Sequence, residues 1–180
     1  MVKRPNILFI MADDHASKAI GCYGHGINRT PNLDRIAAEG MRLNHCYVTN
    51  SICTPSRAAI LTGTYNHVNN VTTLDTPINR SGPNVAKHLR ATGYQTALIG
   101  KWHLGRGPEF GPNAQGFDES LLMASGLYLP ENDPGVVNAR LNFDPVDKFL
   151  WAKMQYAASY NESDWFEPGG YLTDYWPDEA

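Results

Sequence analysis

Uninterrupted apolar segments alternate along this chain with short amphipathic ones. The run from Asn6 to Ala12 is apolar after its first residue and lacks the polar alternation of a half-exposed strand. It therefore predicts a strand buried on both faces, as in a parallel sheet covered by helices. Residues 41–48 are predicted to form a second strand, and residues 94–99 a further buried one.

Helices are predicted between these strands from their start and stop signals. Proline fits the first turn of a helix, and glycine fits a left-handed position after its last turn. Three segments carry both signals, namely 30–40, 54–63 and 83–93, which end at Gly40, Gly63 and Gly93. The alternation of strands and helices predicts an α/β fold.

The second half of the chain has a different pattern. Turn-forming residues dominate from Gly105 to about Pro145, a stretch too long for an idle connection. We expect residues 105–170 to form a loop-rich lobe over a functional site. Residues 171–180 carry the opening signals of a helix and then stop, so we expect a truncated chain.

Composition narrows the possible functions. The chain has 180 residues, consistent with one domain, and a formal net charge of −3 with no basic stripe, which argues against a nucleic-acid partner. No apolar segment approaches the roughly 18 residues of a membrane span, and we expect no membrane partner. Three cysteines make no disulfide framework. Without a recognisable leader, we expect a cytoplasmic protein, or a periplasmic or secreted one if a leader was removed.

Asp13 and Asp14 follow the first predicted strand. Where a strand turns into a loop, neighbouring carboxylates can face one point, and they repel each other unless a cation lies between them. Hard oxygen ligands favour Ca²⁺ or Mg²⁺. A helix cap or a solvated turn is the alternative interpretation of this pair.

A second candidate is the segment from Cys53 to Arg57, which reads Cys-Thr-Pro-Ser-Arg. If Pro55 is the first helical residue, Cys53 lies just before the helix, where free N–H groups favour an anion. Arg57 is four residues further on and shares its face. A nucleophile beside an anion cradle suits sulfuryl or phosphoryl transfer. An ordinary buried cysteine and a surface arginine are the alternative.

The third candidate is Lys101-Trp102-His103, which follows the strand predicted at residues 94–99. In extended chain Lys101 and His103 share a face and Trp102 points away into packing. The lysine can bind an anion and the histidine can move a proton. An unremarkable surface lysine and a hydrogen-bonded histidine are the alternative.

Together these segments resemble the formylglycine-dependent sulfatases of the alkaline-phosphatase-like superfamily. The C-x-P-x-R core with its Leu-Thr-Gly end is highly specific, and the order and spacing of the other blocks agree. The matching blocks are PNILFIMADD at 5–14, TPNLDRI at 30–36, CTPSRAAILTG at 53–63, GYQTALIGKWHLG at 93–105 and GF at 116–117.

The resemblance implies a catalytic apparatus. A maturation enzyme that generates formylglycine would oxidise Cys53, and one hydroxyl of the hydrated aldehyde would attack the sulfur of a sulfated small molecule or glycan. Asp13 and Asp14, with the modified Cys53, would bind Ca²⁺, with Mg²⁺ as the other possibility. Arg57 would anchor the hydrate.

Other residues would contact the substrate. Lys101 would neutralise the sulfate, and His103 would hydrogen-bond the formylglycine hydroxyl and assist its proton transfer. Ser125 and His67 occupy positions at which some members of the family place further polar contacts.

Members of this family are considerably longer than 180 residues. The resemblance therefore implies the N-terminal portion of a sulfatase catalytic domain over residues 1–180. Its mixed, mostly parallel sheet flanked by helices would be incomplete, and we expect this chain alone to be inactive and poorly stable. Two alternatives are a phosphonate monoester or phosphodiester hydrolase of the same superfamily, and an inactive truncated remnant.

Overall fold

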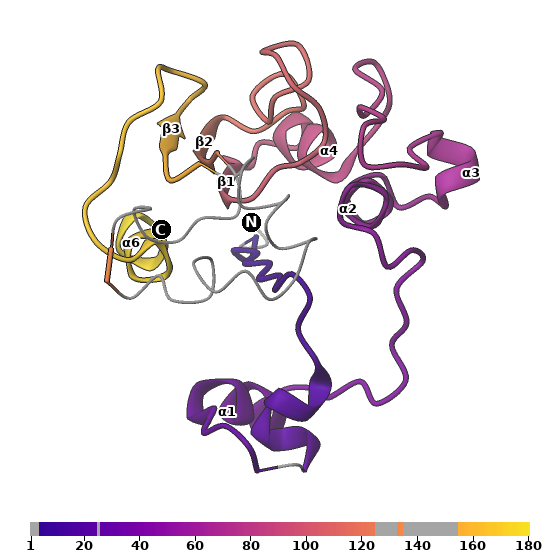
Figure 1. Cartoon of the computed structure of the whole chain (residues 1–180). Coiled ribbons are helices and arrows are strands. Elements are labelled where there is room, and N and C mark those ends of the chain that lie inside the picture. Colours follow the sequence, from indigo (N-terminus) through magenta and orange to yellow (C-terminus); the bar gives the residue numbers. More distant parts are fainter. Residues whose placement is uncertain (1–3, 25, 125–132, 135–154) are drawn as a thin grey trace. The chain divides into compact units, whose positions relative to one another are not determined.

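The computed structural model describes residues 4–24, 26–124, 133–134 and 155–180 of the chain. It comprises two compact units, residues 1–48 and residues 49–180 (Figure 1). The candidate carboxylates lie in the first unit and the other described candidates in the second.

The first unit contains two short 3₁₀ helices and one α-helix. These are η1 (Ser17–Ala19), η2 (Gly21–Tyr23) and α1 (Pro31–Glu39). As predicted, α1 begins with a proline at its first position. Gly40 ends the helix with an N–H donated to the Ile36 carbonyl, but at φ −120° it is not the left-handed cap expected from the sequence.

Side-chain hydrogen bonds join η2 to α1. The Thr30 hydroxyl accepts the Gly21 N–H (2.8 Å) and donates to Oδ1 of Asp34 (3.0 Å). The same Asp34 oxygen accepts the Cys22 N–H (2.7 Å). Thr30 and Asp34 therefore each satisfy one backbone donor of η2, Gly21 N–H and Cys22 N–H respectively.

The expected strands at residues 6–12 and 41–48 are absent from the described structure. Instead, the apolar side chains of the first segment are exposed, with Leu8 at 83% and Ile10 at 72%. A strand exists only when a neighbouring strand accepts its backbone hydrogen bonds, and in the described part of the chain none pairs with either segment. The prediction of strands at residues 6–12 and 41–48 is therefore wrong.

The second unit contains four described α-helices. They are α2 (Cys53–Thr62), α3 (Asn66–Asn69), α4 (Val85–Ala91) and α6 (Leu172–Glu179). Gly63 ends α2 in the predicted left-handed conformation, at φ 66°. Asn84 caps α4 by accepting the Lys87 N–H (3.0 Å).

The described residues form one three-stranded sheet in the order β1–β2–β3. Its strands are β1 (Ala97–Gly100), β2 (Glu119–Met123) and β3 (Ala158–Tyr160). The β1–β2 pair is parallel, with Leu98 opposite Ser120, and the β2–β3 pair is antiparallel. The strand predicted at 94–99 is confirmed in a shorter form. Its residues alternate between exposed and half-buried rather than being buried throughout.

The region expected to be a loop-rich lobe supplies two of these strands. Neither β2 nor β3 was predicted, because short segments of five and three residues between turns give little periodic signal. In β2, Ser120 and residues 121–123 are all buried, whereas the lobe interpretation assumed loops.

The main core of the second unit is formed by residues of α2, of the sheet and of the segments that connect them. Its buried members are Ala58, Leu61, Val71, Ile78, Trp102, Leu104 and Leu122. Leu98 of β1 and Phe117 pack against them. The α/β class predicted from the sequence is thereby confirmed as a mixed sheet flanked by helices.

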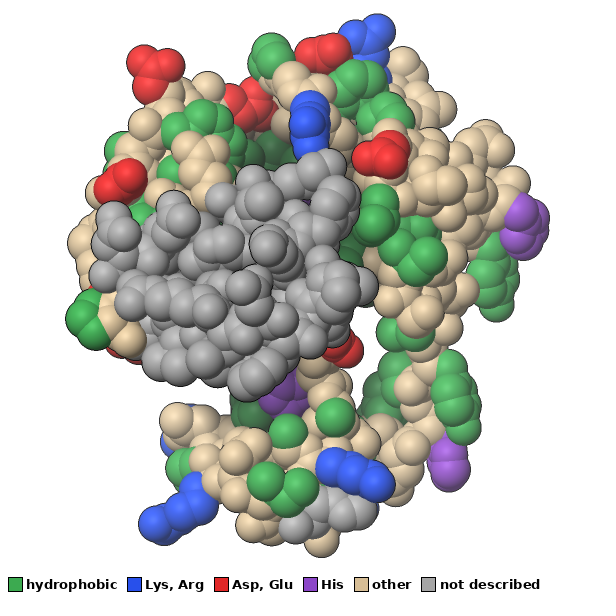
Figure 2. Space-filling view, in the orientation of Figure 1, with side chains coloured by type: hydrophobic (Ala, Val, Ile, Leu, Met, Phe, Trp, Pro, Cys, Tyr) green, Lys and Arg blue, Asp and Glu red, His purple; other side chains and the backbone are tan. Residues whose placement is uncertain are grey.

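Large apolar side chains also remain at the surface, as the green patches of Figure 2 show. Ile60 on α2 and Val85 on α4 are 45% and 49% exposed. Among the described residues no helix combines the length and the apolar character needed to cross a bilayer.

Candidate active site

The first turn of α2 presents one polar face and buries the other. Thr54 and Pro55 are buried, whereas Cys53, Ser56 and Arg57 are partly exposed. Positions i, i+3 and i+4 of a helix share a face, so the cysteine, serine and arginine lie together. The helix begins at Cys53, two residues earlier than the proline signal predicted. Pro55 still fits, because N–H groups in the first turn have no partner within the helix.

The buried side of this turn is hydrogen-bonded to neighbouring segments of the second unit. The Thr54 hydroxyl donates to the Leu74 carbonyl (3.1 Å). The Asn66 amide donates to the carbonyls of Pro55 (2.8 Å) and Val71 (2.9 Å). These bonds fix the turn that carries Cys53, a partly exposed cysteine that forms no disulfide.

Arg57 connects α2 to the segment after β1. Its Nη1 donates to the carbonyl oxygen of Lys101 at 2.7 Å, across 44 residues of sequence. A hydrogen bond from a charged guanidinium is stronger than a neutral one. Two candidates that were separate in the sequence, the Cys53–Arg57 turn and the Lys101–His103 segment, are therefore joined in the second unit.

Burial alternates along the segment that follows β1. Trp102 and Leu104 are buried in the core at 7% and 1% exposed, Lys101 is half-buried and His103 is exposed. This is the alternation that the sequence predicted. The backbone is not extended throughout, because His103 has φ 58°, in the left-handed region. Histidine is one of the few residues enriched there.

Asp13 and Asp14 form a bend in the first unit, and Asp14 has φ 44°. Their carboxylates are the hard donors that Ca²⁺ or Mg²⁺ prefers. Among the described residues no three His, Cys, Asp or Glu side chains gather as a metal site would require. The pair thus fits a divalent cation by the chemistry of its donors and supplies a fraction of the roughly six to eight oxygens that Ca²⁺ takes.

The remaining two candidate residues are His67 and Ser125. His67 lies on α3, is exposed, and stacks its ring against Tyr65 with the centroids 5.8 Å apart. Ser125 lies outside the described residues. Among the described residues, no printed side-chain contact joins His67 to the Cys53 turn.

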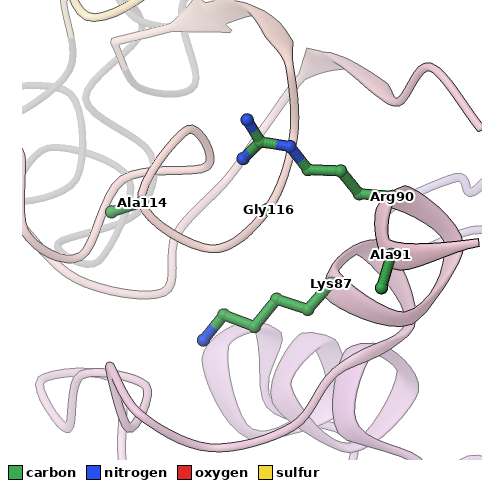
Figure 3. Close-up of a pocket in the computed structure, with 5 residues that line it drawn as sticks. All are labelled: Lys87, Arg90, Ala91, Ala114 and Gly116. Atoms are coloured by element: carbon green, nitrogen blue, oxygen red, sulfur yellow. The ribbon is translucent and has the colours of Figure 1, made fainter. Parts of the chain in front are cut away.

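A pocket of about 380 Å³ lies elsewhere in the second unit, between α4 and a loop (Figure 3). Lys87 and Arg90 extend from α4 toward Ala114 and Gly116. The Lys87 ammonium already donates to the carbonyls of Arg80 and Gly82, and burial lowers its pKa.

Arg90 is likewise engaged, since its Nε lies 2.9 Å from Oδ1 of Asp118. Both cations of the pocket therefore hold the chain together, and none of the residues predicted for catalysis lines it.

Two residues that support the candidate site have hydrogen bonds that the sequence did not predict. Trp102 was expected only to pack, yet its Nε1 also donates to the Phe110 carbonyl (2.9 Å). Asn66 was not singled out at all. No sequence signal distinguishes such an asparagine, because its acceptors are backbone carbonyls that only the fold brings near.

Comparison with known proteins was made by sequence and by structure. An N-acetylglucosamine-6-O-sulfatase of Bacteroides thetaiotaomicron is 49% identical over 122 residues, which cover 68% of this chain and 21% of that protein. Human arylsulfatase A is 46% identical over 129 residues, covering 67% of this chain and 25% of that enzyme. The chain thus spans about a fifth to a quarter of the length of these curated relatives.

Solved structures give the same picture. A protein solved in complex with its substrate, D-glucosamine-2-N,6-O-disulfate, matches with a TM-score of 0.75 and 35% identity. This match covers 98% of the present chain and 30% of the solved one. The model of the Sulfatase family matches residues 5–171, and the chain therefore belongs to the sulfatase family.

Proposed function

We propose that this chain is the N-terminal portion of a sulfatase catalytic domain, and that the protein carrying it hydrolyses sulfate esters. The observation that carries the proposal is the 2.7 Å hydrogen bond from Arg57 to the Lys101 carbonyl. It brings together a nucleophile-bearing helix turn and a segment with one fixed and one titratable positive group. This combination suits the transfer of an anionic ester group.

In this proposal Cys53 acts after oxidation to formylglycine by a maturation enzyme. The hydrated aldehyde carries two hydroxyls, of which one attacks the sulfur and displaces the substrate alcohol. The second hydroxyl then expels sulfate and restores the aldehyde, which a thiol or a serine has no means to do. The partly exposed position of Cys53 at the first helical residue supports access of substrate to it.

Three further side chains act around this nucleophile. Arg57 shares the face of Cys53 and orients the hydrate. Lys101 offsets the charge of the sulfate group, and His103 moves the proton of the attacking hydroxyl. Exposure of His103 and half-burial of Lys101 support their contact with a ligand.

Asp13 and Asp14 of the first unit would hold Ca²⁺, or Mg²⁺. Such a cation supplies positive charge that lowers the cost of charge developing on the ester oxygens. The two carboxylates would bind it as hard oxygen donors, the ligand type that these cations prefer.

We propose a sulfated glycan, and first a 6-O-sulfated amino sugar, as the substrate class. The support is the printed activity of the Bacteroides relative and the substrate of the matched solved structure. In this proposal the loop-rich lobe at 105–170, which includes Ser125, lies over the substrate, and His67 contributes a polar contact.

Maturation is tested on protein from its native host by mass spectrometry of the tryptic peptide from Leu43 to Arg57. We expect a lower mass at Cys53, because an aldehyde replaces the thiol. Cys46 lies in the same peptide and stays open to alkylation, which provides an internal control. An alkylated Cys53 even after co-expression with a maturation enzyme would contradict the proposal.

Catalysis is tested on the natural protein that carries this chain, with glucosamine 6-sulfate and glucosamine 6-phosphate as paired substrates. We expect sulfate release, and a loss of at least about a thousandfold in kcat for Cys53→Ala. Cys46→Ala is the matched control and should keep the parent rate. Faster cleavage of the phosphate ester would favour the phosphorus hydrolase instead.

A further inference from the structure

Residues 101–104 are held by two hydrogen bonds to their backbone carbonyls and by one from a side chain. The Lys101 carbonyl accepts from Arg57 (2.7 Å), and the Leu104 carbonyl accepts the Ile78 N–H (2.9 Å). Between them, the Trp102 indole donates its Nε1–H to the Phe110 carbonyl (2.9 Å). A segment outside any strand thus has a bond on either side of His103.

Trp102 is also fixed by packing. It is 7% exposed and belongs to the same core cluster as Ala58 and Leu61 of α2. Its ring meets Phe117 edge to face, with the centroids 6.1 Å apart and the planes at 85°. A buried indole with a satisfied N–H has little freedom to rotate, so Trp102 fixes the backbone that leads into His103.

His103 has the unusual backbone conformation in this segment. Its φ of 58° is sterically unfavourable for a residue with a Cβ, and such a conformation persists only where its surroundings enforce it. The neighbours on both sides, Trp102 and Leu104, are buried and bonded. Their anchoring accounts for the left-handed turn and for the exposure of the histidine between two core residues.

We propose that Trp102 is a positioning residue for His103. Its bond to the Phe110 carbonyl and its core packing hold His103 in the left-handed conformation from which the imidazole reaches the reacting group. Lys101 is held independently by Arg57, so the two members of the Lys-x-His pair have separate supports. This inference rests on the proposed sulfatase function and adds a residue to it.

The principal test compares Trp102→Phe with Trp176→Phe in the natural protein that carries this chain. Phenylalanine keeps an aromatic ring and removes the N–H donor. Trp176 is a matched control, since it is partly buried and also packs edge to face, on Tyr175 at 5.3 Å. With glucosamine 6-sulfate, we expect kcat per folded molecule to fall about tenfold for Trp102→Phe, with KM nearly unchanged. The control should keep both values.

A double-mutant cycle separates positioning from a general loss of structure. In a His103→Ala background, Trp102→Phe should have no further effect on kcat, because its effect acts through the imidazole. If Trp102→Phe lowers kcat equally in both backgrounds, or does not lower it in either, the positioning role is wrong.

Nuclear magnetic resonance gives a readout that does not depend on activity. The amide and Cβ shifts of His103 should show a left-handed backbone in the parent and in Trp176→Phe, and lose it in Trp102→Phe. A left-handed His103 that survives in Trp102→Phe would overturn the proposal. If the parent releases no sulfate, the sulfatase proposal fails, and these shifts still decide whether Trp102 sets the conformation of His103.

Discussion

Arg57 shows how much one side chain depends on its shape as well as its charge. Its guanidinium lies on the helix face of Cys53, and Nη1 donates to the Lys101 carbonyl at 2.7 Å. The planar group offers several donors in fixed directions, whereas an ammonium is a compact charge on a flexible stem. A substitution that keeps only the positive charge is therefore not expected to preserve this contact.

The Arg57→Lys variant should lose this connection while keeping its charge. We expect the free energy of unfolding to fall by about 1–2 kcal/mol, because a charge-assisted hydrogen bond is lost. The value of kcat/KM should fall by about tenfold or more. Denaturant titration and steady-state kinetics of the natural protein measure the two effects.

Arg90→Lys provides the matched control. Arg90 pairs with Asp118 at 2.9 Å, but its side chain is 56% exposed, so the exchange should cost less than about 1 kcal/mol. Equal effects of the two substitutions would show that the Arg57 contact has no special importance.

At this scale the sequence predicted side-chain burial better than backbone conformation. The alternation that places Trp102 in the core and His103 outside follows from residue type and spacing. The left-handed φ of His103 does not, since any of several backbone paths allows the same burial. The bonds to Phe110 and from Ile78 select one path, and their partners lie elsewhere in the sequence.

At the scale of the elements, the length of α2 is set by the residues at which it begins and ends. It begins at Cys53 and ends at Gly63, whose φ of 66° lets the chain leave the helix while its N–H bonds to the Ala59 carbonyl. Glycine adopts this conformation without the clash that a Cβ would cause.

Gly63→Ala should lower the free energy of unfolding by about 1 kcal/mol, because alanine is strained at that φ. An added Cβ would meet no atom within 4 Å. A decrease in the free energy of unfolding, measured by thermal or chemical denaturation, therefore reports only the cost of the backbone conformation. Gly169→Ala is the control, since its Cβ would also meet nothing and its φ lies outside the left-handed region. A similar loss in both variants would refute this account of the helix end.

The α6 element is anchored through Tyr156. The buried hydroxyl donates to the carbonyls of Pro168 and Gly170, just before the helix begins. Burial raises the pKa of Tyr156 above its ordinary 10.0, and the negative charges of Glu167 and Asp133 add to this. The neutral hydroxyl is the form that the folded state favours.

Tyr156→Phe tests the resulting pH dependence. A raised folded-state pKa gives stability that is complete below the unfolded value near 10.0 and is lost as the pH rises through the folded value. Parent stability should therefore fall in alkaline solution, and Tyr156→Phe should be less stable at neutral pH but lose less on alkalinisation. Denaturant titrations from about pH 8 to 11 measure this. Tyr47→Phe, at an 84% exposed position, should behave like the parent.

Helices were easier to predict than strands for a physical reason. The bonds of α1, α2 and α4 are local, and their prolines, asparagine and glycines mark the ends in the sequence. A strand depends on a partner that can lie anywhere in the chain. The apolar run at 6–12 has none among the described residues, and the brief β3 becomes a strand through its pairing with β2.

Across the whole molecule, the two units differ in how much they bury. In the described part of the first unit, no residue is fully buried. The second unit has the core cluster of Ala58, Leu104 and their neighbours, which joins α2 to the sheet. Buried apolar area is the main favourable term in folding, so the second unit should hold most of the stability of this chain.

Hydrogen exchange of the 180-residue chain tests this difference. Amides of α1 in the first unit should exchange at nearly the rate of an unfolded chain, and those of α2 in the second unit should be protected at least about a hundredfold. Because both are α-helices of similar length, their intrinsic helix bonds are a matched comparison. Equal protection of α1 and α2 would contradict a stability concentrated in the second unit.

The sequence by itself determined the α/β class, the approximate positions of three helices and the membership of a family whose motifs contain Cys53, Arg57, Lys101 and His103. These features are encoded in local spacing, because helix bonds, caps and motif blocks join residues near one another in the chain. The tertiary structure decided that Arg57 reaches Lys101 across 44 residues, that Trp102 is bonded to Phe110, and that β2 and β3 form strands. Each of these depends on backbone groups of a distant segment. Because every residue has such groups, the pattern of side chains does not show which of them will be the partner.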